Sequence, residues 1–497
     1  MKLPESARYI IDKLHEAGYE AYIVGGCVRD FLMGEDPHDW DMTTSARPED
    51  VKRIFSDFNI IDTGIKHGTV TLMMESEPFE ITTYRTDGSY VNSRRPQSVT
   101  FVASLKEDLR RRDFTINAMA WNHTGGLVDY FGGREDLESG IIRCVGNPDE
   151  RLSEDALRIL RALRFASEKD FRIEPDTYMA MRRNLSLLRN ISAERIAVEL
   201  SRTLMGKGVF SALINYPEPL FEIIPELRAA FGFKQNNPHH IYDVYEHTLR
   251  SIANADADLE IRLALLFHDA GKPLCYSEKE GIGHFYGHDR ISADIAEKVL
   301  RRLKYDSATV SNAVRLVENH SLELISSEKI VRRRLSKFGE VFFRKLLRIK
   351  RADSSATSPD TLGERLRAIE ETERIIDKII EENLCFSVKS LAIDGNDLIR
   401  IGIPQGKLIG SILAEVLEMV IDGELENDRE KILEFTERKY IRERDVRCFS
   451  TTSIFILLIS IILSLQSAPL ASILNTFLSL FIMEIHFDKL FETLSFL

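Results

Sequence analysis

The pattern of hydrophobic and polar residues changes near residue 147. Before this point, short β patterns alternate with helical ones, and we expect strands over AYIV, TVTLMM, FEITTYR and GGLVDYF. An amphipathic helix that ends at Gly18 is predicted at the N-terminus. From about residue 148 to 446 the helical period dominates. The pattern therefore predicts an α/β or α+β head followed by all-α regions.

Length and charge narrow the choice of fold and function. With 497 residues the chain is too long for one core, and we expect about three or four domains. Turn-rich boundaries are predicted at 232–240 and 352–360. The net charge of −12 excludes generic attraction to nucleic acid, so RNA binding must use local basic patches. Candidate patches, each of which also suits a solvated helix face, are Arg110-Arg111-Arg112, Arg182-Arg183 with Arg189, and Arg332-Arg333-Arg334.

The cysteines and the two ends of the chain bear on its location. The five cysteines are scattered without paired spacing, and the N-terminus has no signal-peptide core, so we expect a cytoplasmic protein. The C-terminal end is different, because no charged residue occurs from Cys448 to Met483. Residues 448–497 suit membrane contact, as one tilted span or a re-entrant pair. They also suit buried core helices, or a frameshift or read-through past an end near Arg447.

Two glycines and two aspartates lie close together in YIVGGCVRDFLMGEDPHDWDMTT, residues 22–44. Side chains at i and i+2 share a face of a strand, so Asp39 and Asp41 are expected to project together. Two close carboxylates repel unless a cation lies between them, and Mg²⁺ prefers oxygen ligands. Gly25 and Gly26 allow backbone N–H groups to approach phosphate oxygens. The motif predicts a metal-bound nucleoside triphosphate, and a surface turn with two exposed aspartates is the alternative.

The segments GGCVRDFLMG and HDWDMTT closely resemble the signature of polymerase-β-like nucleotidyltransferases. The resemblance is to the class II branch, which contains tRNA CCA-adding enzymes and bacterial poly(A) polymerases, and it extends to about residue 446. It is strongest to CCA-adding enzymes that carry an HD domain. It implies a two-metal Mg²⁺ site on Asp39 and Asp41, with Glu80 as a third catalytic carboxylate and Arg29 in nucleotide binding.

Three further segments resemble motifs of the same family. DGSYVNSRRPQSVTF, residues 87–101, resembles the flexible loop that helps the pocket switch between nucleotides. DYFGGREDL, residues 129–137, resembles the hinge between head and neck. LRRRDFTINAMAW resembles the ribose-reading motif, with Arg112 and Asp113 at its core. An aspartate and an arginine can both bond a 2′-hydroxyl, which is donor and acceptor, and so favour NTP over dNTP.

SEDALRILRALRF, residues 153–165, resembles the base-selecting motif. On one helix, Asp155 and Arg158 are i and i+3 neighbours. Cytosine and adenine both present an amine donor beside a ring-nitrogen acceptor, which a carboxylate and a guanidinium complement. Uracil and guanine present the opposite pattern. The motif therefore predicts a protein template for C and A, with Arg161 as a further member. The alternative is a helix with ordinary ion pairs, such as Glu154 with Arg158.

Histidines and aspartates further along the chain predict a second site. His268 and Asp269 are adjacent at the end of an apolar helix and can turn to one cation, and the wide spacing of the set excludes a zinc finger. The ordered set resembles the HD superfamily of metal-dependent phosphohydrolases. This implies a divalent transition metal and hydrolysis of RNA ends or nucleotides, with a vestigial fold as the alternative. The implied ligands are His247, His268, Asp269 and Asp353, with His288 and His320 as the extra histidines of two-metal members.

Together these resemblances imply an α+β chain in five parts. They are a polymerase-β-like nucleotidyltransferase head (1–147), an all-α neck and body (148–235), an all-α HD domain (236–360), a helical body and tail that bind tRNA (361–447), and the apolar extension (448–497). The implied reaction is template-independent addition of CCA to the tRNA 3′ end from CTP and ATP, with release of pyrophosphate. The rivals are a poly(A) polymerase, a CC-only or A-only enzyme, an HD phosphohydrolase with a nucleotide-binding head, and an RNA-binding scaffold.

Overall fold

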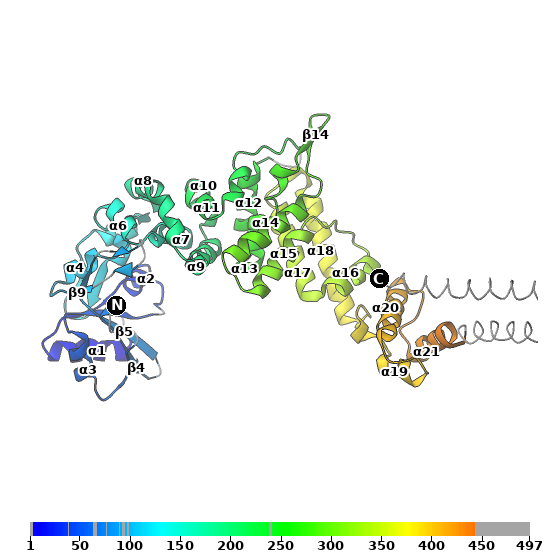
Figure 1. The fold of residues 1–497 in the computed structure, drawn as a ribbon, viewed down its shortest axis with the longest axis horizontal. Helices are drawn as coiled ribbons and strands as arrows, with labels where there is room; N and C mark the ends of the chain where they lie inside the picture. Colours follow the sequence, from blue (N-terminus) through cyan, green and yellow to red (C-terminus); the bar gives the residue numbers. More distant parts are fainter. Residues whose placement is uncertain are drawn as a thin grey trace, which may run out of the picture. The chain divides into compact units, whose positions relative to one another are not determined.

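The computed structural model describes residues 3–37, 39–62, 67–75, 77–88, 90–91, 95–96, 99–237 and 241–442 (Figure 1). Within these residues the chain forms two compact units. The first comprises the residues up to 324 together with 341–373, and the second comprises 325–340 and the described residues from 374. Among the described residues, no helix is both long enough and apolar enough to cross a membrane. The apolar extension 448–497 lies outside them, and the five-part division of the chain stays a prediction.

A mixed sheet forms the centre of the head. Among the described residues its strand order is β11-β10-β1-β2-β5-β4-β3, with β2 and β5 parallel and the other neighbours antiparallel. Side chains alternate between its faces, so Val70 and Leu72 are buried on one strand and Phe79 and Ile81 on its neighbour. The four predicted strands are present. The strands are β1 (Ala21–Val24), β2 (Asp41–Thr44), β3 (Asn59–Ile61), β4 (Thr69–Met74), β5 (Glu77–Thr83), β10 (Met119–Asn122) and β11 (Gly126–Asp129).

Short helices pack on this sheet through apolar faces. The predicted N-terminal helix is present, and it buries Ile10, Ile11 and Leu14. Another helix places Leu105 and Leu109 in the core beside β1. Most of the side chains of the predicted flexible loop at 87–101 lie outside the described residues. The helices of the head are α1 (Glu5–Glu16), α2 (Gly26–Leu32), α3 (Pro48–Ile54), α4 (Leu105–Arg110) and α5 (Gly133–Glu138), and its short strand pairs are β6 (Arg85–Asp87) with β9 (Val99–Phe101) and β7 (Tyr90–Val91) with β8 (Arg95–Pro96).

Helices dominate the rest of the first unit, as the period of the sequence predicted (Figure 1). Some short strands were not predicted: β13 (Arg172–Ile173), which pairs with β12 (Ile141–Ile142), and the hairpin of β14 (Ser277–Lys279) and β15 (Ile282–His284). The helices are α6 (Pro148–Glu154), α7 (Leu157–Lys169), α8 (Pro175–Asn184), α9 (Ala193–Met205), α10 (Val209–Asn215), α11 (Glu218–Ile223), α12 (Val244–Asn254), α13 (Leu259–Phe267), α14 (His288–Arg302), α15 (Ser307–Asn319), α17 (Glu340–Ser354) and α18 (Pro359–Glu381), of which α18 belongs to the second unit from Arg374 onward.

The second unit has its own small core. Leu398, Ile412 and Ile432 are fully buried in it. The predicted basic patch at 332–334 is partly engaged within this unit, because Arg332 Nε donates to Cys385 O at 2.9 Å and Arg333 pairs with Asp422 at 2.7 Å. Arg332 is therefore half-buried within the unit, whereas Arg333 stays exposed, and a role of this patch in RNA binding stays a prediction. Its helices are α16 (Glu328–Phe338), α19 (Gly395–Arg400), α20 (Lys407–Asp422), α21 (Arg429–Glu437) and the π-helical turn η7 (Arg438–Arg442).

Candidate nucleotide and metal sites

The turn after β1 is fitted closely around an arginine. Gly25 precedes α2 with φ +83° and ψ −129°, a conformation that favours glycine. A Cβ on Gly25 would also lie 2.9 Å from Arg112 Nη1. The backbone angle therefore favours glycine at the first position of the predicted phosphate motif, and a Cβ there would also displace the end of the Arg112 side chain.

Arg112 is held in place by a buried carboxylate but is not fully hydrogen-bonded. Asp108 on α4 is fully buried and lies 3.8 Å from Arg112 Nη2. The same carboxylate accepts from Thr43 Oγ1 at 3.1 Å and from Arg111 Nε at 3.0 Å, which fixes α4 to β2. Arg112 Nε is buried without a hydrogen-bond partner among the described residues. An unsatisfied guanidinium N–H beside a glycine turn is the feature expected where an anion binds.

Three carboxylates are neighbours beside this turn. Asp41 begins β2, and Asp39 lies just before the strand rather than within it. The parallel register puts Asp41 opposite Glu80 on β5. Desolvation and the charge of Asp39 raise the pKa of Asp41, although the nearby Arg112 partly opposes this rise. Desolvation and the charges of Asp41 and Asp39 raise the pKa of Glu80. Carboxylates that repel one another in this way form a donor set that suits Mg²⁺.

The prediction of one helix through residues 153–165 is wrong at its start. Asp155 lies between α6, which ends at Glu154, and α7, which begins at Leu157, and it has extended dihedrals of φ −134° and ψ 102°. Its Oδ1 accepts from Leu157 N at 3.1 Å. Such a local side-chain bond competes with helical hydrogen bonding, and here it separates the two helices. Asp155 and Arg158 are therefore not i and i+3 neighbours on one helix.

Asp155 and Arg158 nevertheless line the same pocket. Arg158 Nη1 donates to Glu154 Oε2 at 2.6 Å, so the ordinary ion pair considered as the alternative is present. Asp155 Oδ2 accepts from Arg195 Nη2 of α9 at 3.0 Å. The pocket has a volume of about 250 Å³. It is lined by Arg111, Arg112, Asp113, Asp155, Leu157, Arg158, Arg161 and Arg195.

Asp113 connects this pocket to α2 through hydrogen bonds. Its carboxylate accepts from Asn117 Nδ2 at 3.0 Å and from Arg161 Nε at 2.8 Å. Arg29 Nη1 in turn donates to Asn117 Oδ1 at 2.6 Å. Burial opposes the charge of Asp113, but the Arg161 guanidinium and the Asn117 amide hold the pKa of that carboxyl well below its usual range. In this conformation Arg161 binds Asp113 directly, whereas Arg29 is connected to Asp113 only through Asn117. The predicted contacts of these three residues with nucleotide stay predictions.

All six residues of the predicted second site converge. They form two groups whose ligand atoms lie within 4.8 Å of one another, and together we call them the His-Asp cluster. His247 Nε2 lies 2.9 Å from Asp353 Oδ1, and His288 Nε2 lies 3.5 Å from Asp269 Oδ1. The two groups are His247, His268 and Asp353, and Asp269, His288 and His320.

The orientation of the four imidazoles indicates what the cluster is suited to hold. Each Nδ1 lies against a backbone carbonyl, so each Nδ1 carries the proton. In a neutral imidazole the lone pair is then on Nε2, and the Nε2 atoms face one another at 3.3 Å and 3.2 Å. Four lone pairs and two carboxylates directed at one place fit divalent cations, with a nitrogen-rich donor set that suits transition metals. The Nδ1 contacts are His247 to Ala356 O at 3.1 Å, His268 to Leu265 O at 2.7 Å, His288 to Phe285 O at 2.8 Å and His320 to Val317 O at 2.6 Å.

Known proteins resemble the chain over most of its length. Family models match the "Poly A polymerase head domain" at residues 21–143, the "Probable RNA and SrmB- binding site of polymerase A" at 170–216 and the putative "tRNA nucleotidyltransferase domain 2" at 278–436. The CCA-adding enzyme of Limosilactobacillus reuteri (strain DSM 20016) is 35% identical over 444 residues, which cover 87% of this chain and 96% of that protein. The CCA-adding enzyme of Enterococcus faecalis (strain ATCC 700802 / V583) is 34% identical over 438 residues, which cover 88% of this chain and 96% of that protein.

The chain belongs to the CCA-adding enzyme family. The solved structure of the Bacillus stearothermophilus CCA-adding enzyme in complex with CTP is similar in fold, with a TM-score of 0.64 and 33% identity over 90% of this chain and 100% of that one. The predictions of an α+β fold and of a tRNA nucleotidyltransferase are therefore confirmed. The match at 278–436 is to a domain of tRNA nucleotidyltransferases and includes three residues of the His-Asp cluster, so the HD assignment stays a prediction.

Three residues that support the sites of this CCA-adding family member were not predicted. Asp108 precedes Arg111 and Arg112 by three and four residues, so its role had a signal in the sequence. Arg195 is 40 residues from its partner Asp155 and had none. Lys272 is buried and its Nζ lies 2.7 Å from Asp269 Oδ2, three residues away.

Proposed function

We propose that the chain adds CMP, CMP and then AMP to the 3′ end of tRNA, from CTP and ATP. The observation that carries this proposal is the place of Arg112. Its guanidinium touches the Gly25 turn and also lines the pocket of Asp155 and Arg158. One side chain thus connects the position expected for phosphates with the position expected for the base. The printed names of the relatives, one of them solved with CTP, support the same reaction.

In the proposed reaction, Asp39, Asp41 and Glu80 hold Mg²⁺. When bound, the ions lower the pKa of the attacking hydroxyl and neutralise charge on the phosphates. The 3′-hydroxyl of tRNA would give its proton to water, and its oxygen would form a bond to the α-phosphorus. The bond from that phosphorus to the bridging oxygen breaks, and pyrophosphate leaves. Arg112, beside the Gly25 turn, donates to the phosphates through its terminal N–H groups, and with Asp113 it is also the predicted reader of the ribose 2′-hydroxyl.

In the proposed base selection, the same protein donor and the same protein acceptor serve both CTP and ATP. Asp155 accepts from the exocyclic amine of cytosine or adenine, and Arg158 donates to the adjacent ring nitrogen. Arg195 acts as a positioning residue, because its bond to Asp155 Oδ2 holds the carboxylate at the break between α6 and α7. Asp113 and Arg161 complete the wall of the pocket. Recognition of the tRNA acceptor end by the helical regions, and a cytoplasmic location, belong to the same proposal.

Nucleotide selection tests this proposal. The wild-type chain is expected to incorporate CTP and ATP into tRNA that lacks CCA and to reject UTP and GTP, because a mismatched base leaves charged groups unpaired at a cost of about 1–3 kcal/mol each. Asp155→Ala is expected to lose this discrimination, and Asp41→Asn is expected to lose incorporation of every nucleotide. Equal use of all four nucleotides by the wild type would contradict the template role of Asp155 and Arg158.

We also propose that the His-Asp cluster hydrolyses phosphate esters, in the manner of an HD phosphohydrolase. The observation that favours this second function is the inward direction of four Nε2 lone pairs, fixed by four Nδ1 contacts with carbonyls. Bound transition metal would supply a hydroxide at neutral pH. The four histidines and two aspartates would hold the metal, and the overall reaction would add water across the ester P–O bond, with OH to phosphorus and H to the leaving alcohol oxygen.

A metal-dependent phosphatase assay tests the second function. Hydrolysis of p-nitrophenyl phosphate is expected with Mn²⁺, Co²⁺ or Ni²⁺, and it is expected to fall by about 10³-fold in Asp269→Asn. The matched control is Asp294→Asn, because Asp294 is an exposed carboxylate on α14, the helix that begins at His288, and lies outside the cluster. Wild-type protein that binds metal but shows no turnover would contradict the proposal.

A further inference from the structure

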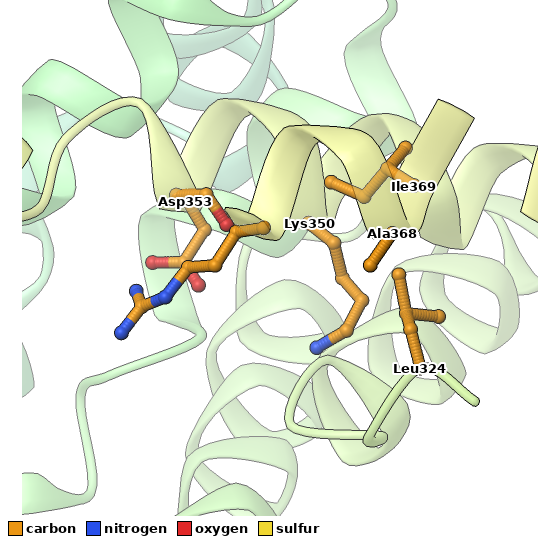
Figure 2. Close-up of a pocket in the computed structure, with 7 residues that line it drawn as sticks. Leu324, Lys350, Asp353, Ala368 and Ile369 are labelled. Atoms are coloured by element: carbon orange, nitrogen blue, oxygen red, sulfur yellow. The ribbon is translucent and has the colours of Figure 1, made fainter. Parts of the chain in front are cut away.

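A pocket of about 240 Å³ adjoins the His-Asp cluster and shares Asp353 with it. Its walls come from the end of α17, from α18 and from the segment after α15. Figure 2 shows Lys350 with Asp353 on one side of it and Leu324, Ala368 and Ile369 on the other. The pocket thus has a polar end near the cluster and an apolar end away from it. Its lining residues are Leu324, Lys350, Asp353, Ser354, Arg365, Ala368 and Ile369.

Two cationic side chains line the polar end. Lys350 Nζ donates to the backbone carbonyl of His320 at 3.0 Å, so the ammonium is fixed directly beside a cluster residue. Arg365 Nη1 donates to Thr357 Oγ1 at 3.1 Å. Among the described residues no carboxylate lies within 4.0 Å of Arg365, although the chain has an excess of acidic residues. A guanidinium has five N–H donors in a planar fork that matches phosphate oxygens.

We propose that this pocket binds the phosphate of a small organic phosphate ester, with Arg365 and Lys350 as the anion-binding residues. The phosphate lies between these two cations and Asp353, which places it against the metal side of the cluster. The organic group packs on the apolar wall of Leu324, Ala368 and Ile369. The volume of about 240 Å³ selects a compact ester, on the scale of one sugar phosphate or one nucleotide. The inference rests on the proposed phosphohydrolase function, for which it names two substrate-binding residues.

Binding of inorganic phosphate to the full chain tests the pocket without requiring turnover. Calorimetry is run on Mn²⁺-loaded protein and again on protein stripped with a chelator. Arg365→Met is expected to weaken phosphate binding by about tenfold or more in both forms, and Arg365→Lys to recover part of it. Arg367→Met is the matched control, because it removes an equal charge from an exposed position on α18 two residues away. Metal content and melting temperature are measured for each variant to show that the cluster is intact.

The same variants are then assayed with p-nitrophenyl phosphate. Arg365→Met is expected to raise KM by about tenfold with kcat within about twofold, because the interaction is present in the ground state and in the transition state. Phosphate binding that is undetectable in the wild type, or unchanged in Arg365→Met, would overturn the proposal that the pocket binds phosphate. Hydrolysis by the cluster would not be contradicted by this result. Phosphate binding that depends on Arg365, without any turnover, would support the anion-binding role of the pocket. It would contradict the proposed phosphohydrolase function of the cluster.

Discussion

At the scale of single residues, the head site depends on positions that meet two requirements at once. Gly25 needs a left-handed backbone and also leaves room for Arg112. Asp155 both ends a helix and presents a carboxylate to the pocket. Residues with double roles of this kind tolerate few substitutions, and matched variants can separate the two requirements.

Substitution of Gly25 is expected to reduce both stability and nucleotide binding. Gly25→Ala adds backbone strain of about 1–2 kcal/mol and places a methyl group against Arg112 Nη1. Gly18→Ala is the control, because Gly18 has nearly the same φ, +84°, with nothing within 4 Å of a Cβ. We expect both variants to melt at a lower temperature and only Gly25→Ala to raise KM for ATP. An equal effect of the two variants on KM would show that the contact with Arg112 has no role.

Loss of Arg195 is expected to impair base selection more than folding. The Arg195 side chain is about one-third exposed, so its ion pair with Asp155 contributes only about 0–1 kcal/mol to stability. Without it the carboxylate is no longer held in one position, and we expect lower kcat/KM for CTP and ATP with more UTP misincorporation. Arg202→Met, on the same helix and paired with Glu168, is the control. Single-turnover incorporation measures the effect, and unchanged selectivity in Arg195→Met would argue against a positioning role.

Some of these residues could be predicted from the sequence because their geometry is local. The pair of Asp39 and Asp41 was found from its i, i+2 spacing, although only Asp41 lies within β2 and the expected alternation along one strand does not include Asp39. Three of the cluster histidines bond the carbonyl three residues before them. For His268 and His320 the preceding helix supplies this carbonyl, and for His288 the turn before α14 does. Arg195 could not be found in this way, because its partner is 40 residues away and the contact depends on how α9 packs.

At the scale of elements, the division between α6 and α7 was the main feature missed. Apolar residues continue with a helical period across the break, and periodicity alone therefore predicts one helix. The interruption comes from Asp155, whose side chain bonds Leu157 N in place of a helical contact. Aspartate before an apolar run is a signal for a helix start, and it was present in the sequence. Long strands and helices were predicted well, because their patterns extend over many residues.

The short helix α4 is expected to depend on Asp108. Its buried carboxylate accepts hydrogen bonds from Thr43 and Arg111. An amide in its place would turn an N–H donor toward one of these donor groups. We therefore expect Asp108→Asn to lower the free energy of unfolding by about 1–3 kcal/mol and to raise KM for CTP through misplaced Arg112. Glu107→Gln is the control, since Glu107 makes only a more exposed pair with Arg110 at 3.5 Å. Urea unfolding measures the first effect, and wild-type stability in Asp108→Asn would exclude the anchoring role.

At the scale of the whole molecule, the chain carries two clusters of different chemistry. Oxygen ligands gather beside the sheet of the head, whereas the helices after it bring together imidazoles and carboxylates. Mg²⁺ suits the first set and transition metals suit the second. Because the two sets share no residue, their activities are expected to be separable.

Variants in the two clusters are expected to have opposite effects. Asp353→Asn should lower the content of bound transition metal and abolish phosphatase activity, while CCA addition with Mg²⁺ stays within about twofold of wild type. Asp41→Asn should do the reverse. Metal analysis and both assays on each purified variant check this. Loss of both activities in either variant, with an unchanged melting temperature, would indicate one shared site.

The most direct measurement of the central claim is the length of the RNA product. Full-length protein is mixed with Mg²⁺ and tRNA that lacks its CCA end, and CTP alone, ATP alone or both are supplied. We expect extension by two residues with CTP, none with ATP alone, and by three with both, because Asp155 and Arg158 accept both bases and the product ends at CCA. Long A tails, extension that stops at CC when both nucleotides are present, or extension that begins only on a CC end would contradict the account.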